Sequence, residues 1–467
     1  MVRMFKLIQN EYIKIFRKVS TLIIFILVIL TSIGLVGLSK YSQIQNAKWE
    51  ERYPTEDSYD YSGQVKEAKD APYVGSDKDI DMYQFLMDNK ITYASWKTNV
   101  TRSMYEYSVV VGEDGKETAE YVMSESDRTK LNTFIMNSDW KACCQYIIDT
   151  SKAQKLDENE YWEYQYRIDN NIALPTSFDE DVEWKNMLIN SIAFAKAELV
   201  NIKDQKDPES LETIDSREGE IAIGLYRLEN NIEVNVADID SEDALYGGQM
   251  TMWHVMKMSV SMISLIGLLV IVITGSSLAN EFSRGTIKFL LINPVKRWKI
   301  LTSKYITSLT IGFLMLVIMF VFTSLGSMMA FGTAEVSSRY ITFVDGAIKV
   351  GSPWVSMIKS YLIGSVNVIV MATLAFAISS LVRSSALAIG VGIFSMLSGS
   401  TLVVLLKEGL KQDWARYLVF ANTDLNSIID GTSMFSNQTL GFAIAVLAVH
   451  MVVFALVAWD GFVRREV

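Results

Sequence analysis

Six long uncharged stretches constrain this chain more than any other feature of its sequence. A transmembrane helix needs about 20 apolar residues, rising about 1.5 Å each, to cross a hydrocarbon core of about 30 Å. None of the six contains Asp, Glu, Lys or Arg, and His450 is the one side chain in them whose ordinary pKa lies near neutral pH. They are residues 19–39, 258–279, 306–331, 361–382, 384–406 and 438–459. The sequence therefore predicts an all-α membrane protein with six transmembrane helices.

Composition excludes several other classes of protein. The 467 residues carry 43 Lys and Arg against 53 Asp and Glu, and this net charge of −10 argues against a nucleic-acid binder. Half of the residues are hydrophobic, which excludes a disordered chain, and two Cys exclude a disulfide framework. A mean hydropathy of +0.20 with 21% charged residues indicates an average over an apolar part and a polar part.

The distribution of Lys and Arg predicts the orientation in the membrane. With the N-terminus inside, the cytoplasmic segments are 1–18, 280–305, the turn at Arg383 and 460–467. These hold 14 basic and 4 acidic residues, whereas residues 40–257 hold 23 basic and 43 acidic residues. The two short outer loops, 332–360 and 407–437, together hold six basic and six acidic residues. We expect both termini in the cytoplasm of a bacterial plasma membrane and 40–257 outside.

The first span, 19–39, is expected to remain as an anchor. Its apolar run is too long for a cleaved signal peptide, 18 residues precede it, and no A-x-A site follows.

Residues 40–257 are predicted to form a mostly helical extracytoplasmic domain with a small β-hairpin. Helical spacing of apolar residues predicts helices over 124–153, 181–202 and 211–232. Two short strands, 107–111 and 118–122, flank the turn sequence Gly112-Glu-Asp-Gly115. The acidity of this domain could attract a cationic peptide, or it could simply keep an exposed domain soluble.

Cys143 and Cys144 are adjacent, so a disulfide between them would be strained. They lie in a helical pattern and are expected to be small core residues, with a vicinal redox pair as the alternative. No metal site is expected, because the two His, His254 and His450, lie far away in the sequence.

Residues 2–18 are predicted to form an amphipathic helix in the membrane interface. At about 100° per residue, one side of this helix is apolar and the opposite side is basic or polar. The apolar side holds Met4, Phe5, Ile8, Tyr12, Ile15 and Phe16, and the opposite side holds Arg3, Lys6, Asn10, Lys14 and Arg17.

The segment 280–305 has the pattern of a short helix parallel to the membrane. Gly285 permits a break after the second span, Thr286 can cap a helix through 287–291, and Pro294 ends it. Lys296, Arg297 and Lys299 hold the segment inside. This shape suits docking to a partner, and a plain basic connector is the alternative.

This segment resembles the intracellular coupling segment of ABC-2 type transporter permeases. The matching residues are Glu281, Gly285, Thr286, Leu290, Leu291, Pro294, Val295, Arg297 and Lys304. The N-terminal Asn10-Glu11-Tyr12-Ile13-Lys14, followed by Arg17-Lys18, is similar to the elbow helix of that family. The six-span order with both termini inside also matches. The resemblance covers the membrane portion, about half of the chain, and places Glu11, Lys14 and Arg17 in the elbow.

The resemblance implies an ATP-driven transporter of two permease subunits and two ATPase subunits. ATP and Mg would be bound by the partner ATPase, because this chain contains no G-x-x-x-x-G-K-[ST] sequence. The chain itself is expected to be no enzyme, with no catalytic, cofactor or metal residues. The second permease would be another copy or a related subunit. Family dimers use the first and fifth spans, which makes Gly392, Ser395 and Gly399 candidates for that contact, with packing inside one subunit as the alternative.

The spans also bear on the cargo. Ion-coupled carriers commonly place carboxylates or Lys near the midplane, and these spans have none. An apolar lining suits export of a hydrophobic or amphipathic cargo, such as a peptide, an antimicrobial or a lipid-like molecule. The alternative is a signalling or mechanotransmitting protein, in which a cytoplasmic ATPase moves the outer domain against an envelope partner without transport.

Overall fold

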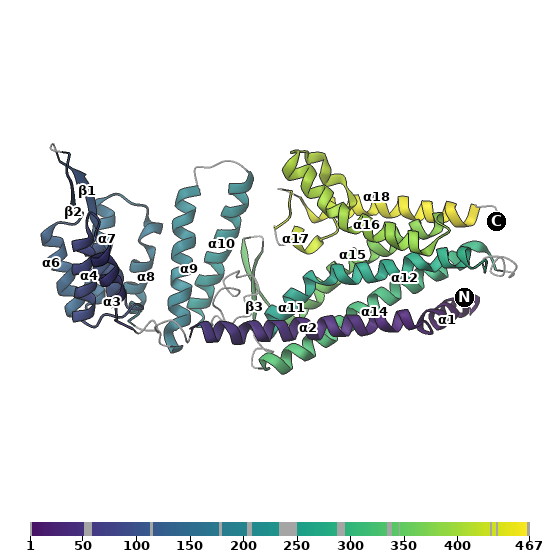
Figure 1. The fold of residues 1–467 in the computed structure, drawn as a ribbon, viewed down its shortest axis with the longest axis horizontal. Helices are drawn as coiled ribbons and strands as arrows, with labels where there is room; N and C mark the ends of the chain where they lie inside the picture. The colour runs from purple at the N-terminus through teal and green to yellow at the C-terminus, as the bar shows by residue number, and fades with distance from the viewer. Residues whose placement is uncertain are drawn as a thin grey trace. The chain divides into compact units, whose positions relative to one another are not determined.

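The computed structural model describes residues 2–50, 58–112, 115–176, 180–202, 208–232, 250–286, 295–333, 339–344, 346–429, 432–435 and 438–464. It divides into two compact units, and most of their helices are labelled in Figure 1. The membrane unit comprises Met1–Ile44, Asn235–Ile341 and Val350–Val467. The polar unit comprises Gln45–Val234 and Thr342–Lys349.

In the described part of the chain, six helices of the membrane unit are long and apolar enough to cross a membrane. They confirm the six predicted spans and the all-α class. They are α2 (Val19–Glu50), α12 (Ile263–Ser283), α14 (Arg297–Phe331), α15 (Pro353–Leu381), α16 (Ser385–Val404) and α18 (Leu440–Trp459). The predicted N-terminal helix is α1 (Val2–Phe16), and the chain turns at Arg17 and Lys18 before α2 begins.

Short helical segments complete the membrane unit. They are α11 (Met252–Ser261), η4 (Leu405–Gly409), η5 (Asp413–Tyr417), η6 (Val419–Ala421), α17 (Leu425–Ile429) and η7 (Asp460–Arg464).

Helices α12 and α15 form the centre of the membrane unit. In the most apolar stretch of α12, 61% of the residues are buried, against 17% in α16 and in α18. Gly364 lets α15 approach closely, since a Cβ there would lie 2.6 Å from Ile263 Cδ1. The Ser379 hydroxyl oxygen accepts hydrogen bonds from the amides of Leu278 and Ala279, at 3.2 and 3.0 Å. The outer faces of α16 and α18 are therefore left for lipid or for another chain.

Two helix boundaries differ from the predicted spans. The second span is broken, because α11 ends at Ser261 and α12 begins at Ile263. Between them, the Met262 amide bonds to the Ser259 carbonyl oxygen at 3.1 Å, a tighter turn than an α-helix makes. The third membrane helix, α14, begins at Arg297 instead of 306. The last part of the predicted segment 280–305, from 297 onward, is therefore helical. Its basic residues can extend along the helix end toward the headgroups while the backbone stays helical.

The polar unit is mostly helical, with antiparallel strands β1 (Tyr107–Val111) and β2 (Glu117–Tyr121) forming the predicted hairpin. Its helices are α3 (Ser62–Asp70), α4 (Ser76–Asp88), α5 (Trp96–Tyr105), α6 (Glu125–Met136), α7 (Trp140–Ala153), η1 (Glu158–Glu160), α8 (Trp162–Asn170), α9 (Glu180–Ile202) and α10 (Pro208–Glu229). A second hairpin, β3 (Tyr340–Val344) and β4 (Ala347–Gly351), was not predicted, and its turn groups with this unit.

The single helix predicted over 124–153 was wrong, because the chain breaks between α6 and α7. Ser138 adopts a left-handed conformation with φ of 54°, which ends α6. Asp139 then caps α7 by accepting a hydrogen bond from the Ala142 amide at 3.0 Å. A capping Asp in the middle of an apolar pattern therefore divides one predicted helix into two.

Cys143 and Cys144 are free thiols, fully buried in the core of the polar unit. They pack in a cluster with Leu86, Leu131 and Ile135. Burial raises the pKa of each thiol to about 12. The interpretation as core residues is confirmed, and at neutral pH neither sulfur is a reactive thiolate.

These thiols are expected to resist alkylation in the folded chain. With maleimide at pH 7, the native protein should incorporate well under one equivalent, whereas the denatured protein should incorporate two. Intact-mass spectrometry counts the adducts. Rapid native labelling at either Cys143 or Cys144 would contradict their burial.

Candidate functional site

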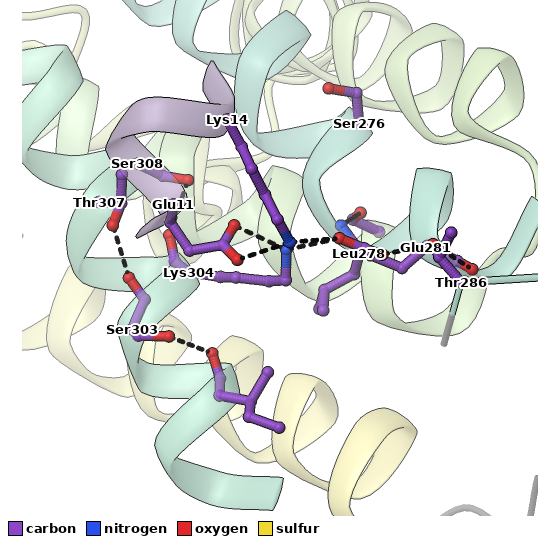
Figure 2. A network of polar contacts seen from close by, with 12 residues as sticks. Glu11, Lys14, Ser276, Leu278, Glu281, Thr286, Ser303, Lys304, Thr307 and Ser308 are labelled. Carbon is purple, nitrogen blue, oxygen red and sulfur yellow. Dashed lines mark hydrogen bonds and ion pairs between the residues drawn. The ribbon is translucent and has the colours of Figure 1, made fainter. Parts of the chain in front are cut away.

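A buried ion-pair network joins α1, at the start of the chain, to α12 and α14, which lie more than 250 residues later (Figure 2). Lys304, in the first turns of α14, is 3% exposed. Its Nζ atom lies 2.8 Å from Glu11 Oε2 on α1 and 3.2 Å from Glu281 Oε1 near the end of α12. The side chains of Glu11 and Glu281 are 11% and 14% exposed. One ammonium group thus holds two nearly buried carboxylates.

Lys14 completes the network from the outside. Its Nζ lies 3.3 Å from Glu11 Oε1 and 3.5 Å from Glu281 Oε1, and its side chain is half exposed. Although burial opposes the charge, the carboxylates of Glu11 and Glu281 raise the pKa of Lys14 above its usual value. Two carboxylates and two ammonium groups balance, so the network is neutral in charge. We call these four residues, Glu11, Lys14, Glu281 and Lys304, the α1 network.

Thr286, just after α12, forms a hydrogen bond with a member of the α1 network. Thr286 Oγ1 donates a hydrogen bond to the Glu281 carboxylate. Gly285 between them has φ of 70°, in the left-handed region that glycine adopts without strain. The predicted backbone break at Gly285 is therefore present. The predicted helix 287–291, with Leu290, and its end at Pro294 lie outside the described residues.

The other end of the same connector contacts the C-terminal segment. Arg297 Nη1 donates to the Val463 carbonyl oxygen in η7 at 3.4 Å. Val295 packs against the buried cluster that includes Leu278 and Phe462. The sequence predicts 460–467 only as a cytoplasmic tail, and no sequence pattern indicates this contact.

Further cations lie beside the α1 network. Lys18 follows α1, and Arg284 follows α12. Burial, together with the nearby charges of Lys304 and Arg284, lowers the pKa of Lys18. Arg17 is exposed at the turn between α1 and α2. Since the network itself is neutral, these side chains give this end of the membrane unit a positive surface.

Sequence motifs identified all four members of the network but not their relation. Glu11 and Lys14 were assigned to the elbow and Glu281 to the coupling segment, whereas Lys304 was only the residue leading into the third span. The structure makes Lys304 the central residue. A signal was available, because a lone charge at a membrane boundary needs a partner, and Glu11, Glu281 and Lys304 all lie at such boundaries.

The small residues of α16 contact helices of the same chain. A Cβ at Gly392 would lie 2.6 Å from Ile271 Cγ2, and one at Gly399 would lie 2.1 Å from Phe420 Cδ2. Ser395 is partly buried, and its hydroxyl donates to the Val391 carbonyl oxygen at 2.7 Å. Both glycines therefore make close packing contacts inside this chain.

Comparison with known proteins places the membrane unit in a family. Residues 223–467 match the family model described as "Protein of unknown function (DUF2705)". The uncharacterized protein YhcI of Bacillus subtilis (strain 168) is 34% identical over 291 residues, 62% of this chain and 86% of that protein. The uncharacterized membrane protein YdbK of the same organism is 34% identical over 204 residues, 44% of this chain and 78% of that protein. The chain therefore belongs to the DUF2705 family.

Proposed function

We propose that the chain is the permease subunit of an ABC-2 type transporter, driven by a separate ATPase polypeptide that binds ATP and Mg. The observation that supports this function is the α1 network. It ties α1 to the end of α12 and the start of α14, which are the two helices that flank the connector 284–296. Removing one partner of a buried ion pair is strongly unfavourable, by about 3–5 kcal/mol. A force on the connector would therefore move the three helices together.

In this proposal the end of the membrane unit that carries the α1 network faces the cytoplasm. The excess of Lys and Arg in 1–18 and 280–305 supports that orientation. The polar unit would then lie outside the plasma membrane. A functional complex would contain two permeases, either two copies or a related pair, and two ATPases.

The proposed cargo is hydrophobic or amphipathic, and its direction is outward. The midplane stretches of the six spans contain no Asp, Glu, Lys or Arg that could carry an ion or a proton. The interior of the membrane unit is instead built from apolar side chains, as in the cluster of Ile266, Val270 and Ile311. A lipid-like molecule or an apolar peptide fits this chemistry better than a small ion.

The alternative function is transmission of a signal or force without transport. The size of the polar unit and its own hydrophobic core motivate it. The two functions differ in one measurable quantity, which is flux of a cargo across the membrane.

Two variants, one in the connector and one at the first residue of α14, test the permease function. The chain is co-purified with its candidate ATPase and reconstituted in liposomes containing a fluorescent lipid. Gly285→Pro and Arg297→Glu should leave insertion of the chain into the membrane intact. Each should reduce both the transport of the fluorescent lipid and the stimulation of ATP hydrolysis in the co-purified ATPase by at least fivefold. Pro cannot adopt the φ of 70° at Gly285, and Glu would repel the Val463 carbonyl. Lys299→Gln, two residues from Arg297, is the matched control.

Each outcome of this experiment separates the hypotheses. Loss of coupling in both variants supports the permease function. ATPase stimulation without any flux of lipid or peptide supports the signalling alternative. Full activity of both variants, or no association with any ATPase, would overturn the coupling role of the connector.

The orientation gives a separate prediction. A single cysteine introduced at Ser126 in the polar unit should react with a membrane-impermeant maleimide on intact cells. A cysteine introduced at Lys6 on α1 should react only after permeabilisation. Both positions are exposed, and the native cysteines are buried, so the background is low. Labelling of intact cells at Lys6 but not at Ser126 would show the opposite orientation.

A further inference from the structure

Two cations, Lys18 and Arg284, lie at the same boundary of the membrane unit. The first span begins at Val19 and the second ends at Ser283, so each cation is one residue outside a span. The ends of transmembrane helices lie at the level of the lipid headgroups. Both side chains are exposed, and the charge of Arg284 acts on Lys18, which places the two cations close together beside the α1 network.

Among the described residues, no carboxylate forms an ion pair with Lys18 or Arg284. The two carboxylates of the α1 network are already held by the two ammonium groups of that network. Partial burial and the nearby charges of Lys304 and Arg284 lower the pKa of Lys18, and the carboxylates of the network act in the opposite direction more weakly. An anion between Lys18 and Arg284 would therefore relieve the repulsion between them.

An apolar stripe of α2 begins one helical turn from Lys18. The Leu22 amide donates a hydrogen bond to the Lys18 carbonyl oxygen at 3.4 Å, and Ile26 lies one further turn along the helix. Leu22 and Ile26 are 59% and 46% exposed in the chain. Because α2 is long and apolar enough to cross a membrane, this stripe lies at the depth of the acyl chains. A pair of cations at headgroup level is thus followed by an apolar surface.

We propose that Lys18 and Arg284 bind the phosphate of an anionic phospholipid, whose acyl chains lie along Leu22 and Ile26. The occupant is argued from its position, because lipid headgroups surround this end of the six spans in a bilayer. Phosphatidylglycerol keeps the negative charge of its phosphate, whereas the choline group of phosphatidylcholine cancels it. Juxtamembrane cations attract anionic lipids for this reason. Lys18 also precedes the first turn of α2, and a helix N-terminus favours a nearby anion.

This site goes beyond the permease function and does not rest on it. It needs only the six spans, which place both cations at headgroup level in either orientation of the chain. A phosphate bound to both side chains would join the turn between α1 and α2 to the end of α12. Lipid binding needs neither the ATPase nor flux of a cargo, so its failure is distinguishable from a failure of the permease function.

Native mass spectrometry of the full chain, released from dodecylmaltoside micelles, counts bound lipids and gives Kd. Phosphatidylglycerol should bind at least tenfold more tightly than phosphatidylcholine with the same acyl chains. Lys18→Gln with Arg284→Gln should reduce this preference to less than twofold. Glycerol 3-phosphate carries the phosphate without acyl chains, and at the concentration of the lipid it should not displace phosphatidylglycerol.

The chain offers a matched control for net charge. Lys6 on α1 and Lys296, just before α14, are exposed cations at the same end of the membrane unit. Lys6→Gln with Lys296→Gln should change the lipid preference less than twofold. Equal losses in the two double variants would assign binding to the diffuse positive charge of this end and overturn the site. Equal Kd values of the two lipids for the unmodified chain would also overturn it.

Two further results would contradict the lipid as the occupant. Displacement of phosphatidylglycerol by glycerol 3-phosphate would show a site for a free phosphate group, to which the acyl chains contribute nothing. Efficient disulfide cross-linking of Leu22→Cys between two copies in the membrane would show that a second chain covers the stripe. The native cysteines are buried, so they do not interfere with this cross-link.

Discussion

Replacement of Lys304 by Met should lower the free energy of unfolding of the membrane unit by about 3–5 kcal/mol, the range for breaking a buried ion pair. The ammonium group of Lys304 lies 2.8 Å from Glu11 and 3.2 Å from Glu281. Met fills a similar volume but leaves two nearly buried carboxylates facing each other with only the half-exposed Lys14 between them. Most of the lost stability comes from the two carboxylates that remain buried without Lys304, and less comes from the loss of its favourable ion pairs.

Lys14→Met is the matched control, because it removes a second cation from the same two carboxylates. Its side chain is 51% exposed, so its ion pairs are screened by water and should contribute less than about 1 kcal/mol. Thermal unfolding of the detergent-solubilised chain, followed by tryptophan fluorescence, ranks the variants. The apparent Tm of Lys304→Met should fall clearly below that of Lys14→Met.

A triple variant separates charge from packing. Adding Glu11→Gln and Glu281→Gln to Lys304→Met removes both uncompensated carboxylates and should recover at least half of the lost stability. If the triple variant is no more stable than Lys304→Met, the loss arises from packing around α14. Equal Tm values for Lys14→Met and Lys304→Met would contradict the central role of Lys304.

The six spans were predictable because a transmembrane helix is a local feature. Twenty apolar residues in a row satisfy the bilayer without reference to any other part of the chain. The break at Met262 was not predictable in this way, since uncharged residues continue on both sides of it from 258 to 279. It depends on how α11 packs, and the Ser259 hydroxyl there is within 2.6 Å of the Tyr361 hydroxyl on α15.

The α1 network was only partly predictable for the same reason. Glu11 and Lys304 are 293 residues apart, and no periodic pattern connects them. Local spacing could place Lys14 one turn from Glu11, but the burial of Lys304 results from the meeting of α1, α12 and α14. In the polar unit, likewise, the β1–β2 turn was visible in Gly112-Glu-Asp-Gly115. The β3–β4 hairpin was missed because it comes from a loop between two spans.

Replacement of Arg167 by Met should have an effect of similar size in the polar unit, about 3–5 kcal/mol. Arg167 on α8 is fully buried. Its Nε donates to Glu163 at 2.8 Å, and its Nη1 donates to Asn186 on α9 at 2.8 Å and to the Ala173 carbonyl oxygen at 3.2 Å. Met would leave a carboxylate, an amide and a carbonyl without their donor, which is the costly case for buried polar groups.

Hydrogen–deuterium exchange of the full chain measures this loss where it occurs. A loss of about 3 kcal/mol should speed exchange of the protected amides of α8 and α9 by about 100-fold, while α12 and α15 keep their protection. Arg102→Met, at an exposed position of α5, is the matched control and should leave both units unchanged. Exchange in α8 and α9 that is no faster in Arg167→Met than in Arg102→Met would show that the buried guanidinium does not hold these helices together. Faster exchange in α12 as well would show that the two units unfold as one.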